Sequence, residues 1–337
     1  MEQKHRLINH FKAMQQACEP LGCTATVNAL TMRLELTRGT QNYSLQPQFI
    51  QIVDGKRSYG PRFTADSRIF IGWLPYFNRR WELANSKIRF KEYCQKHSIR
   101  IPEFSVSPDA KMAHVVVKSD QSSFGDSVLG PYASSAAHRL EAGEFYEAYL
   151  PGVIAKIWFW NGEPVALETQ KPPYVVGNGK DTVRDLLIQQ MRLGERIVIN
   201  EVEKIAKGFR DYKKIQLTDV PPHGAEVPVD FRYGSPFYVR RLVEDVLFPS
   251  EKYAALEADF RRVGGLLLDS IPADIRANTA FTVDAILDAE GKASYLEMNS
   301  NPFIHPAIYA PMVKALFPPE SQENAFAHRP TSGVTLQ

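Results

Sequence analysis

Three side chains near the C-terminal end of the sequence could together bind a metal ion. Asp284 interrupts an apolar run over residues 281–287, and Glu297 and Asn299 lie two positions apart in the next such run. Side chains two apart in a strand share a face, so a hairpin would set Asp284 opposite Glu297 and Asn299. Two carboxylates and an amide oxygen form an incomplete all-oxygen ligand set that suits Mg²⁺. The alternative is the solvated face of an edge strand.

A second group of residues could meet a polyphosphate. Residues 114–118 form a short β-branched strand that ends in Lys118. A turn of small residues follows it and includes Ser122, Ser123 and Gly125. Backbone N–H groups of such a turn, with an ammonium group at its start, favour an anionic ligand. Upstream, Lys87 lies at the start of a predicted helix, where a solvated lysine is the ordinary alternative.

The elements around these residues resemble a known superfamily. The spacing D-x(12)-E-x-N-x-N-P, which begins at Asp284, is similar to the metal-binding hairpin of ATP-grasp enzymes. The continuation N-P-F-I-H-P and the stretch K-P-P-Y-V-V-G-N-G-K-D-T-V at residues 171–183 resemble the ATP-grasp modules of bifunctional glutathione synthetase and cyanophycin synthetase. The resemblance implies an α+β (α/β) fold of the ATP-grasp type. Two α+β subdomains would clasp the nucleotide behind a small N-terminal domain.

The same resemblance implies a division of the chain into four parts. These are an N-terminal pre-ATP-grasp-like domain over residues 1–85, an N-terminal (lid) subdomain over 86–150, a C-terminal subdomain with the metal hairpin over 151–318, and a flexible tail over 319–337. The motifs for nucleotide and metal would therefore come from both subdomains.

Ligand roles can be carried over residue by residue. Asp284, Glu297 and Asn299 would bind Mg²⁺, with Mn²⁺ as the alternative ion. ATP phosphates would meet five residues: Lys87, Lys118, Ser122, Ser123 and Gly125. Lys156, which stands where relatives carry an arginine, would also bind the nucleotide. The backbone that reads the adenine edge would be that of Glu147, Ala148, Tyr149 and Leu150. Relatives place an acid for the ribose where this chain has Ile154, so Glu147 is the alternative for that contact.

Two basic residues are the candidates for catalysis. The residue that contacts the transferring phosphate in relatives falls on Lys171 or its neighbour Gln170, and Lys171 is the assignment adopted. Arg232, beside a Gly-Ser turn, could bind a carboxylate substrate through a bidentate guanidinium contact. The family's Asn-rich, Ser-Thr-Gly-Gly loop is replaced around Arg232, which argues against glutathione or cyanophycin as the product.

The implied function is an ATP-dependent C–N ligase of the acid–amino-acid type. It would form an amide or peptide bond between a small-molecule carboxylate, an amino acid or small peptide, and an amine through an acyl phosphate. Two alternatives stay open. One is an ATP-grasp phosphotransferase that stops at phosphorylation, and the other is a non-catalytic nucleotide-binding protein.

Composition limits the other classes of function. The 337 residues carry 40 Lys and Arg against 38 Asp and Glu without a long basic run, which gives no support to nucleic-acid or membrane partners. No stretch of about 18 apolar residues occurs. The three cysteines show neither disulfide nor metal spacing and fit a reducing compartment. We therefore expect a cytoplasmic protein. Because proteins of the family it resembles are often dimers or tetramers, a homo-oligomer is possible.

Overall fold

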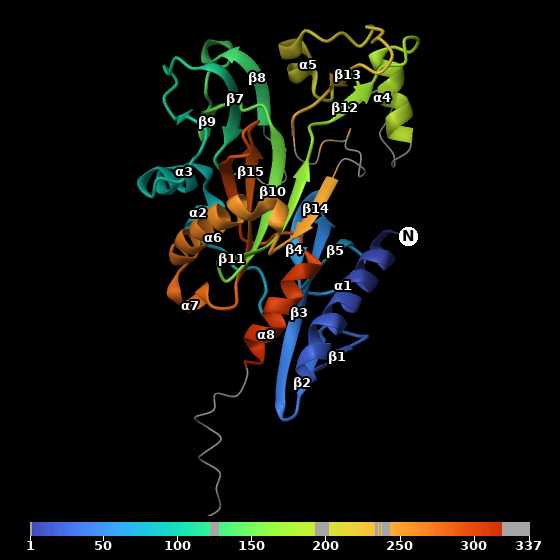
Figure 1. Ribbon diagram of the computed structural model, residues 1–337, viewed down its shortest axis with the longest axis vertical. Coiled ribbons are helices and arrows are strands. Elements are labelled where there is room, and N and C mark those ends of the chain that lie inside the picture. The colour runs from blue at the N-terminus through green and yellow to red at the C-terminus, as the bar shows by residue number, and fades with distance from the viewer. Residues whose placement is uncertain are drawn as a thin grey trace, which may run out of the picture. The chain divides into compact units, whose positions relative to one another are not determined.

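The chain folds into two compact units of mixed helices and antiparallel sheets (Figure 1). The computed structural model describes residues 2–121, 128–192, 202–232, 235, 237 and 243–318. Met1–Phe77 and Phe303–Gln337 form the first unit, and Asn78–Pro302 forms the second. The predicted α+β fold class is confirmed. No helix in the described part of the chain is both long and apolar enough to span a membrane.

The first unit contains a five-stranded antiparallel sheet in the order β1-β2-β3-β4, with β5 paired to β3. The strands are β1 (Thr24–Val27), β2 (Leu34–Arg38), β3 (Gln41–Val53), β4 (Lys56–Gly60) and β5 (Ser67–Leu74). Its helices are α1 (Glu2–Cys18) and α8 (Tyr309–Leu316), with 3-10 turns η1 (Glu19–Leu21) and η6 (Pro306–Ile308).

The segment that begins at Phe303 belongs to the first unit, together with Met1–Phe77. The N–H of Ile304 donates to the carbonyl of Ile71 at 3.0 Å, and His10 Nδ1 lies 2.7 Å from the Tyr309 hydroxyl. Gly72 has φ +135°, and a Cβ there would lie 2.7 Å from the Cβ of Ile304. These contacts link residues more than 200 positions apart, so no local pattern predicts them.

The second unit is built on a five-stranded antiparallel sheet, called here the central sheet. Its order is β14 (Val243–Leu247), β11 (Glu163–Gln170), β10 (Val153–Trp160), β15 (Ala280–Leu287) and β16 (Ala293–Asn299). A four-stranded sheet, the lid sheet, has the order β6 (Phe104–Ser105), β9 (Glu144–Ala148), β7 (Ala113–Ser119) and β8 (Val128–Ser134). A small pair joins β12 (Tyr174–Val176) to β13 (Glu226–Pro228).

Six helices and two 3-10 turns of the described chain complete the second unit. They are α2 (Glu82–Asn85), α3 (Lys87–Lys96), η2 (Ser135–Ala137), α4 (Val183–Arg192), α5 (Lys207–Lys213), η5 (Glu251–Tyr253), α6 (Ala254–Asp269) and α7 (Ala273–Arg276). The start of α3 is fixed by Ser86, whose hydroxyl accepts from the N–H of Arg89 at 3.1 Å. Lys87 is therefore the first residue of the helix, close to its predicted position.

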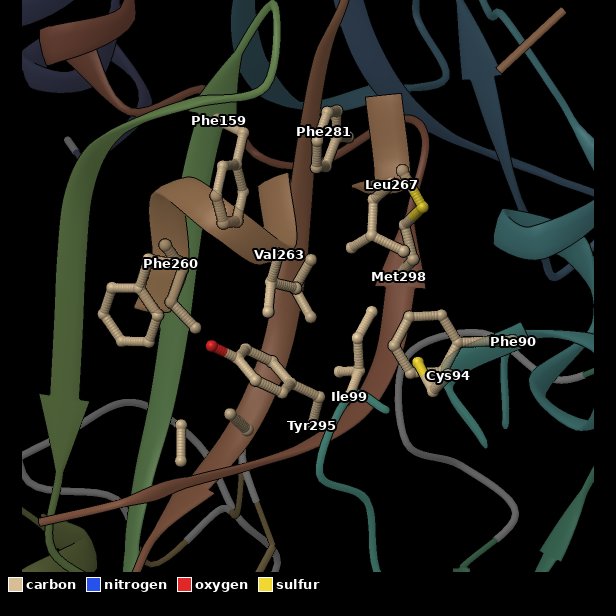
Figure 2. Packing of buried hydrophobic residues seen from close by; sticks show 14 of the residues in the cluster. Phe90, Cys94, Ile99, Phe159, Phe260, Val263, Leu267, Phe281, Tyr295 and Met298 are labelled. Carbon is tan, nitrogen blue, oxygen red and sulfur yellow. The ribbon is translucent and has the colours of Figure 1, made fainter. Parts of the chain in front are cut away.

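One face of the central sheet carries the main hydrophobic core (Figure 2). Phe159 and Phe281 stack at 4.9 Å between ring centroids on neighbouring strands. Helix α6 packs onto this face with Phe260, and α3 contributes Phe90 and Cys94, all fully buried. Because side chains alternate along each strand, the opposite face, called here the polar face, carries the charged Lys156 and Asp284 beside apolar residues such as Ile154 and Trp158.

Shortening Phe260 should measure how far this core stabilises the sheet. Phe260→Ala removes a fully buried ring that packs against Phe248 and Tyr295, and we expect a loss of about 3–5 kcal/mol in the free energy of unfolding. The control Val106→Ala alters an exposed side chain and should change it by less than about 0.5 kcal/mol. Urea unfolding monitored by circular dichroism gives both values, and equal losses would contradict the assignment of this core.

Candidate functional site

A row of charged residues crosses the polar face of the central sheet. Lys156 of β10 is paired in register with Asp284 of β15, and Asp284 is paired with Glu297 of β16. On the other side, Lys156 is paired with Glu168 of β11. Residues directly opposite in antiparallel strands point to the same face. Four neighbouring strands therefore present one cation and three carboxylates side by side.

A β-bulge in β16 gives Glu297 its orientation. Ala285 is paired with Tyr295 and Asp284 with Glu297, so Leu296 is the extra residue between two pairs. In a regular strand, with Leu296 paired in register, Tyr295 and Glu297 would share a face. With it, the Tyr295 ring is fully buried in the core while Glu297 lies on the polar face.

A hydrogen bond connects the row to Asn299, and an ion pair connects it to Lys87. Lys156 Nζ lies 2.7 Å from Asp284 Oδ1, and Asn299 Nδ2 lies 3.3 Å from Asp284 Oδ2. Lys87 Nζ lies 3.3 Å from Glu297 Oε2. The side chains of Asp284 and Glu297 retain 16% and 26% of their exposure, so both carboxylates can be reached by a ligand. The structure thus brings together all three residues predicted to bind metal.

The two carboxyl groups differ in acidity. Burial raises the pKa of Asp284, and the Glu297 carboxylate adds to this effect against the Lys156 ammonium. Burial also disfavours the charged form of Glu297, but Lys87, Lys118 and Lys156 outweigh it and lower its pKa. The pKa values of these two neighbouring carboxyl groups are therefore shifted in opposite directions.

Lys118 and Glu147 form the part of the site that belongs to the lid sheet. Lys118 Nζ of β7 donates to Glu147 Oε1 of β9 at 2.5 Å. Burial lowers the pKa of Lys118, but Glu147 and Glu297 outweigh that effect and raise it, so the group stays charged. Both oxygens of Glu147 bind lysines, the second being held by Lys91. Glu147 is therefore a lysine-binding group, and its carboxylate is not open to a ribose.

The oxygen donors fit a hard divalent cation. Asp284 and Glu297 supply two carboxylates, and Asn299 supplies its amide oxygen once the amide is turned so that Oδ1 replaces Nδ2, atoms that differ only in assignment. Within the described ranges no group of three or more His, Cys, Asp or Glu could hold a metal ion. The candidate site thus depends on an amide as its third ligand, which hard ions such as Mg²⁺ accept.

The segment predicted to read adenine follows β9. The N–H of Ala148 donates to Glu103 and that of Tyr149 donates to His114, at 2.8 and 2.7 Å, so both are used within the protein. For the N–H of Leu150 no hydrogen bond is recorded among the described residues. Leu150 is therefore the residue of this segment whose backbone donor can serve a ligand.

The two residues predicted to act in catalysis lie apart from the charged row. Lys171 is exposed just after β11 ends at Gln170, and Gln170 shares the polar face with Glu168. Arg232 binds buried Asp230 in a bidentate manner, with Nε–Oδ1 at 3.1 Å and Nη2–Oδ2 at 3.0 Å. The acid two positions earlier could have indicated this pairing. Three residues predicted to contact phosphate lie outside the described residues: Ser122, Ser123 and Gly125.

Two residues of the site were missed by sequence reasoning. Asp120 Oδ1 accepts from the Ser86 hydroxyl at 2.7 Å and from the N–H of Ile88 at 2.9 Å, which fixes the start of α3 beside Lys87. Lys91, one helical turn after Lys87, is fully buried against Glu147. The i, i+4 spacing was the available signal, although lysines in helices are usually solvated.

Comparisons with known proteins give structural likeness only. No family model and no curated protein sequence matches the chain. Among solved structures it is similar to a bifunctional glutathione synthetase from Pasteurella multocida, at 14% identity and a TM-score of 0.45, over 92% of this chain and 43% of that one. It is also similar to a D-alanine–D-alanine ligase from Bacillus anthracis, at 9% identity and a TM-score of 0.35, over 69% of this chain and 66% of that one.

A third similar structure is the ATP-grasp ligase PsnB with a minimal precursor, at 11% identity and a TM-score of 0.31, over 69% of this chain and 59% of that one. The chain spans less than half the length of the glutathione synthetase. Scores this low carry no residue roles, which depend on the contacts described above.

The buried Glu147 carboxylate should make stability depend on pH. Burial opposes its charge, but Lys118 and Lys91 outweigh it and lower the pKa of Glu147 below the ordinary 4.5. A lowered folded-state pKa gives stability that is present above about pH 4.5 and is lost as the pH falls through the folded-state value. Thermal unfolding between pH 7 and 3 should show this loss. Glu147→Gln should be less stable at pH 7 and show a shallower decline, and an unchanged slope would contradict the pairing.

Proposed function

We propose that the chain is an ATP-dependent ligase that joins a carboxylate to an amine through an acyl phosphate. The observation that carries the proposal is that Lys87 of α3, Lys118 of the lid sheet and Lys156 of the central sheet all act on Asp284 or Glu297. Such a cluster combines a cation site with groups that bind a polyanion. The motif resemblance adds the reaction class.

The charge balance of the cluster suits a metal-bound triphosphate. The lysines at positions 87, 91, 118 and 156 oppose the carboxylates at 147, 168, 284 and 297, which gives 4 − 4 = 0. A divalent cation would raise this to +2, which would offset part of the charge of a triphosphate. The apolar core beneath the sheet keeps the local dielectric low, so these interactions are stronger than they are in water.

The residues present fit Mg²⁺ or Mn²⁺, with Asp284, Glu297 and Asn299 as ligands. When bound, the ion would neutralise charge on the phosphate oxygens. The ammonium groups of Lys87, Lys118 and Lys156 would orient the phosphates and stabilise negative charge as it moves to the leaving group. The N–H of Leu150 would donate to the base. Lys171 and Arg232 stay proposals for the transferring phosphate and the acyl carboxylate.

The proposed reaction needs no nucleophile from the protein. An oxygen of the substrate carboxylate forms a bond to the γ-phosphorus as the bond to ADP breaks, which gives the acyl phosphate. The amine nitrogen then forms the C–N bond, phosphate leaves, and one proton passes to solvent. What the chain contributes is position and charge.

A screen for ADP release tests the proposal directly. Purified protein is incubated with ATP, Mg²⁺ and pairs of amino acids or small peptides, and products are identified by mass spectrometry. We expect ADP, phosphate and a condensed product only when both substrates are present. A stable phosphorylated product formed without an amine would indicate a phosphotransferase. ATP binding without turnover across the whole panel would indicate a non-catalytic protein.

Substituting Glu297 tests the metal assignment. Glu297→Ala should lower ADP formation by about 100-fold or more, because a ligand of the phosphate-bound cation is lost. Circular dichroism should show retained folding. The control Glu290→Ala removes an exposed acid at the turn of the same hairpin and should leave turnover unchanged. Unchanged turnover in Glu297→Ala would remove the metal assignment.

Removing the cation is the complementary test. EDTA should abolish ADP formation by the wild-type protein, since the carboxylates and lysines alone cannot neutralise the triphosphate. Added Mg²⁺ or Mn²⁺ should restore it, because both ions accept carboxylate and amide oxygens. Full activity in EDTA would contradict a metal site in the hairpin.

A further inference from the structure

Lys91 is a buried cation for which the proposed reaction has no direct use. Its side chain is fully buried in α3, four residues after Lys87. Residues four apart lie on the same helical face, so α3 directs two ammonium groups toward one side. Lys87 reaches Glu297, whereas Lys91 reaches Glu147. With no exposed surface, Lys91 cannot itself contact a ligand.

Four groups lie around the Lys91 ammonium group. It pairs with Glu147 Oε2, and it donates to the carbonyl of Leu296 at 3.4 Å. The rings of Phe104 and Phe145 lie 5.8 and 6.0 Å away. Leu296 is the extra residue of the bulge in β16 and precedes Glu297. The ammonium group thus connects the lid sheet to the strand that carries the candidate metal ligands.

The contact with Glu147 continues to Lys118. Glu147 holds Lys91 through Oε2 and Lys118 through Oε1. Its lowered pKa keeps it ionised, and two lysines share one negative charge. If Lys91 were absent, the full charge of Glu147 would act on Lys118 alone. Lys118 would then be held more tightly by protein and would offer less of its charge to a phosphate.

We propose that Lys91 is a positioning residue for ATP binding, which sets the place and effective charge of Lys118 through the shared carboxylate of Glu147. The inference rests on the proposed function, because Lys118 must contact a phosphate. The Leu296 carbonyl holds Lys91 against the central sheet. Through Glu147, Lys91 then fixes the position of Lys118 of the lid sheet relative to the candidate cation site.

A double-mutant cycle on ATP affinity tests the inference. Lys91→Met keeps the side-chain length without the charge, Lys118→Met removes the phosphate contact, and the third variant combines them. Isothermal titration with ATP and Mg²⁺ gives both Kd and the fraction of active protein. We expect Lys91→Met to raise Kd about 10-fold in the wild-type background but less than about 2-fold in the Lys118→Met background.

The controls separate positioning from stability. Lys96→Met makes the same substitution at an exposed site of the same helix and should leave Kd unchanged. A purely structural role would lower the thermal midpoint or the active fraction of Lys91→Met with an unchanged Kd, and this would overturn the inference. Equal effects of Lys91→Met in both backgrounds would overturn it too.

Two further outcomes are informative. If Lys91→Met does not fold, Glu147→Gln removes the charge through which Lys91 acts on Lys118 and frees Lys118 for phosphate, so it should lower Kd; an unchanged Kd overturns the inference. Wild-type protein that binds no ATP overturns the proposed function together with this inference. Wild-type protein that binds ATP, with a Lys91→Met variant of equal affinity, overturns only the role of Lys91.

Discussion

Buried charge is the constraint on which the second unit depends. An ionised group removed from water loses several kcal/mol of hydration, and only close partners compensate for it. Lys91, Glu147, Lys118 and Lys156 are nearly buried, and each has an oppositely charged partner within a short distance. Replacing such groups with apolar residues often stabilises a protein. Their concentration on α3, the lid sheet and the central sheet is the observation from which the proposed function is argued.

The two faces of the central sheet allow these charges to exist. One face is filled by α6 and α3, which makes the sheet rigid, while the other carries the charged row. Strand β16 has to place one side chain in the core and another on the polar face, and the bulge at Leu296 makes both possible. It turns Tyr295 into the core and Glu297 onto the polar face, so neither residue weakens the role of the other. A regular strand could not satisfy both.

The sequence predicted the parts of this arrangement that depend on short-range periodicity. Asp284, Glu297 and Asn299 were expected to meet because hairpin pairing and a period of two are local rules, and the structure brings them together. The bulge could not be predicted, because no residue type or spacing around Leu296 distinguishes a bulged strand from a regular one. The hydrogen bond between Ile304 and Ile71 could not be predicted either, because it joins residues that are far apart in the sequence.

Lys91 shows why the remaining site residues were hidden. A lysine in a helix is usually solvated, so its type argued against burial, and only its spacing from Lys87 indicated a shared face. What decides its place is a carboxylate on β9 and a carbonyl on β16, both remote in sequence. A positioning residue does not contact the ligand. It can therefore be recognised only from the residues that it contacts. A buried, fully paired lysine next to a charged site is therefore as informative about that site as the exposed groups are.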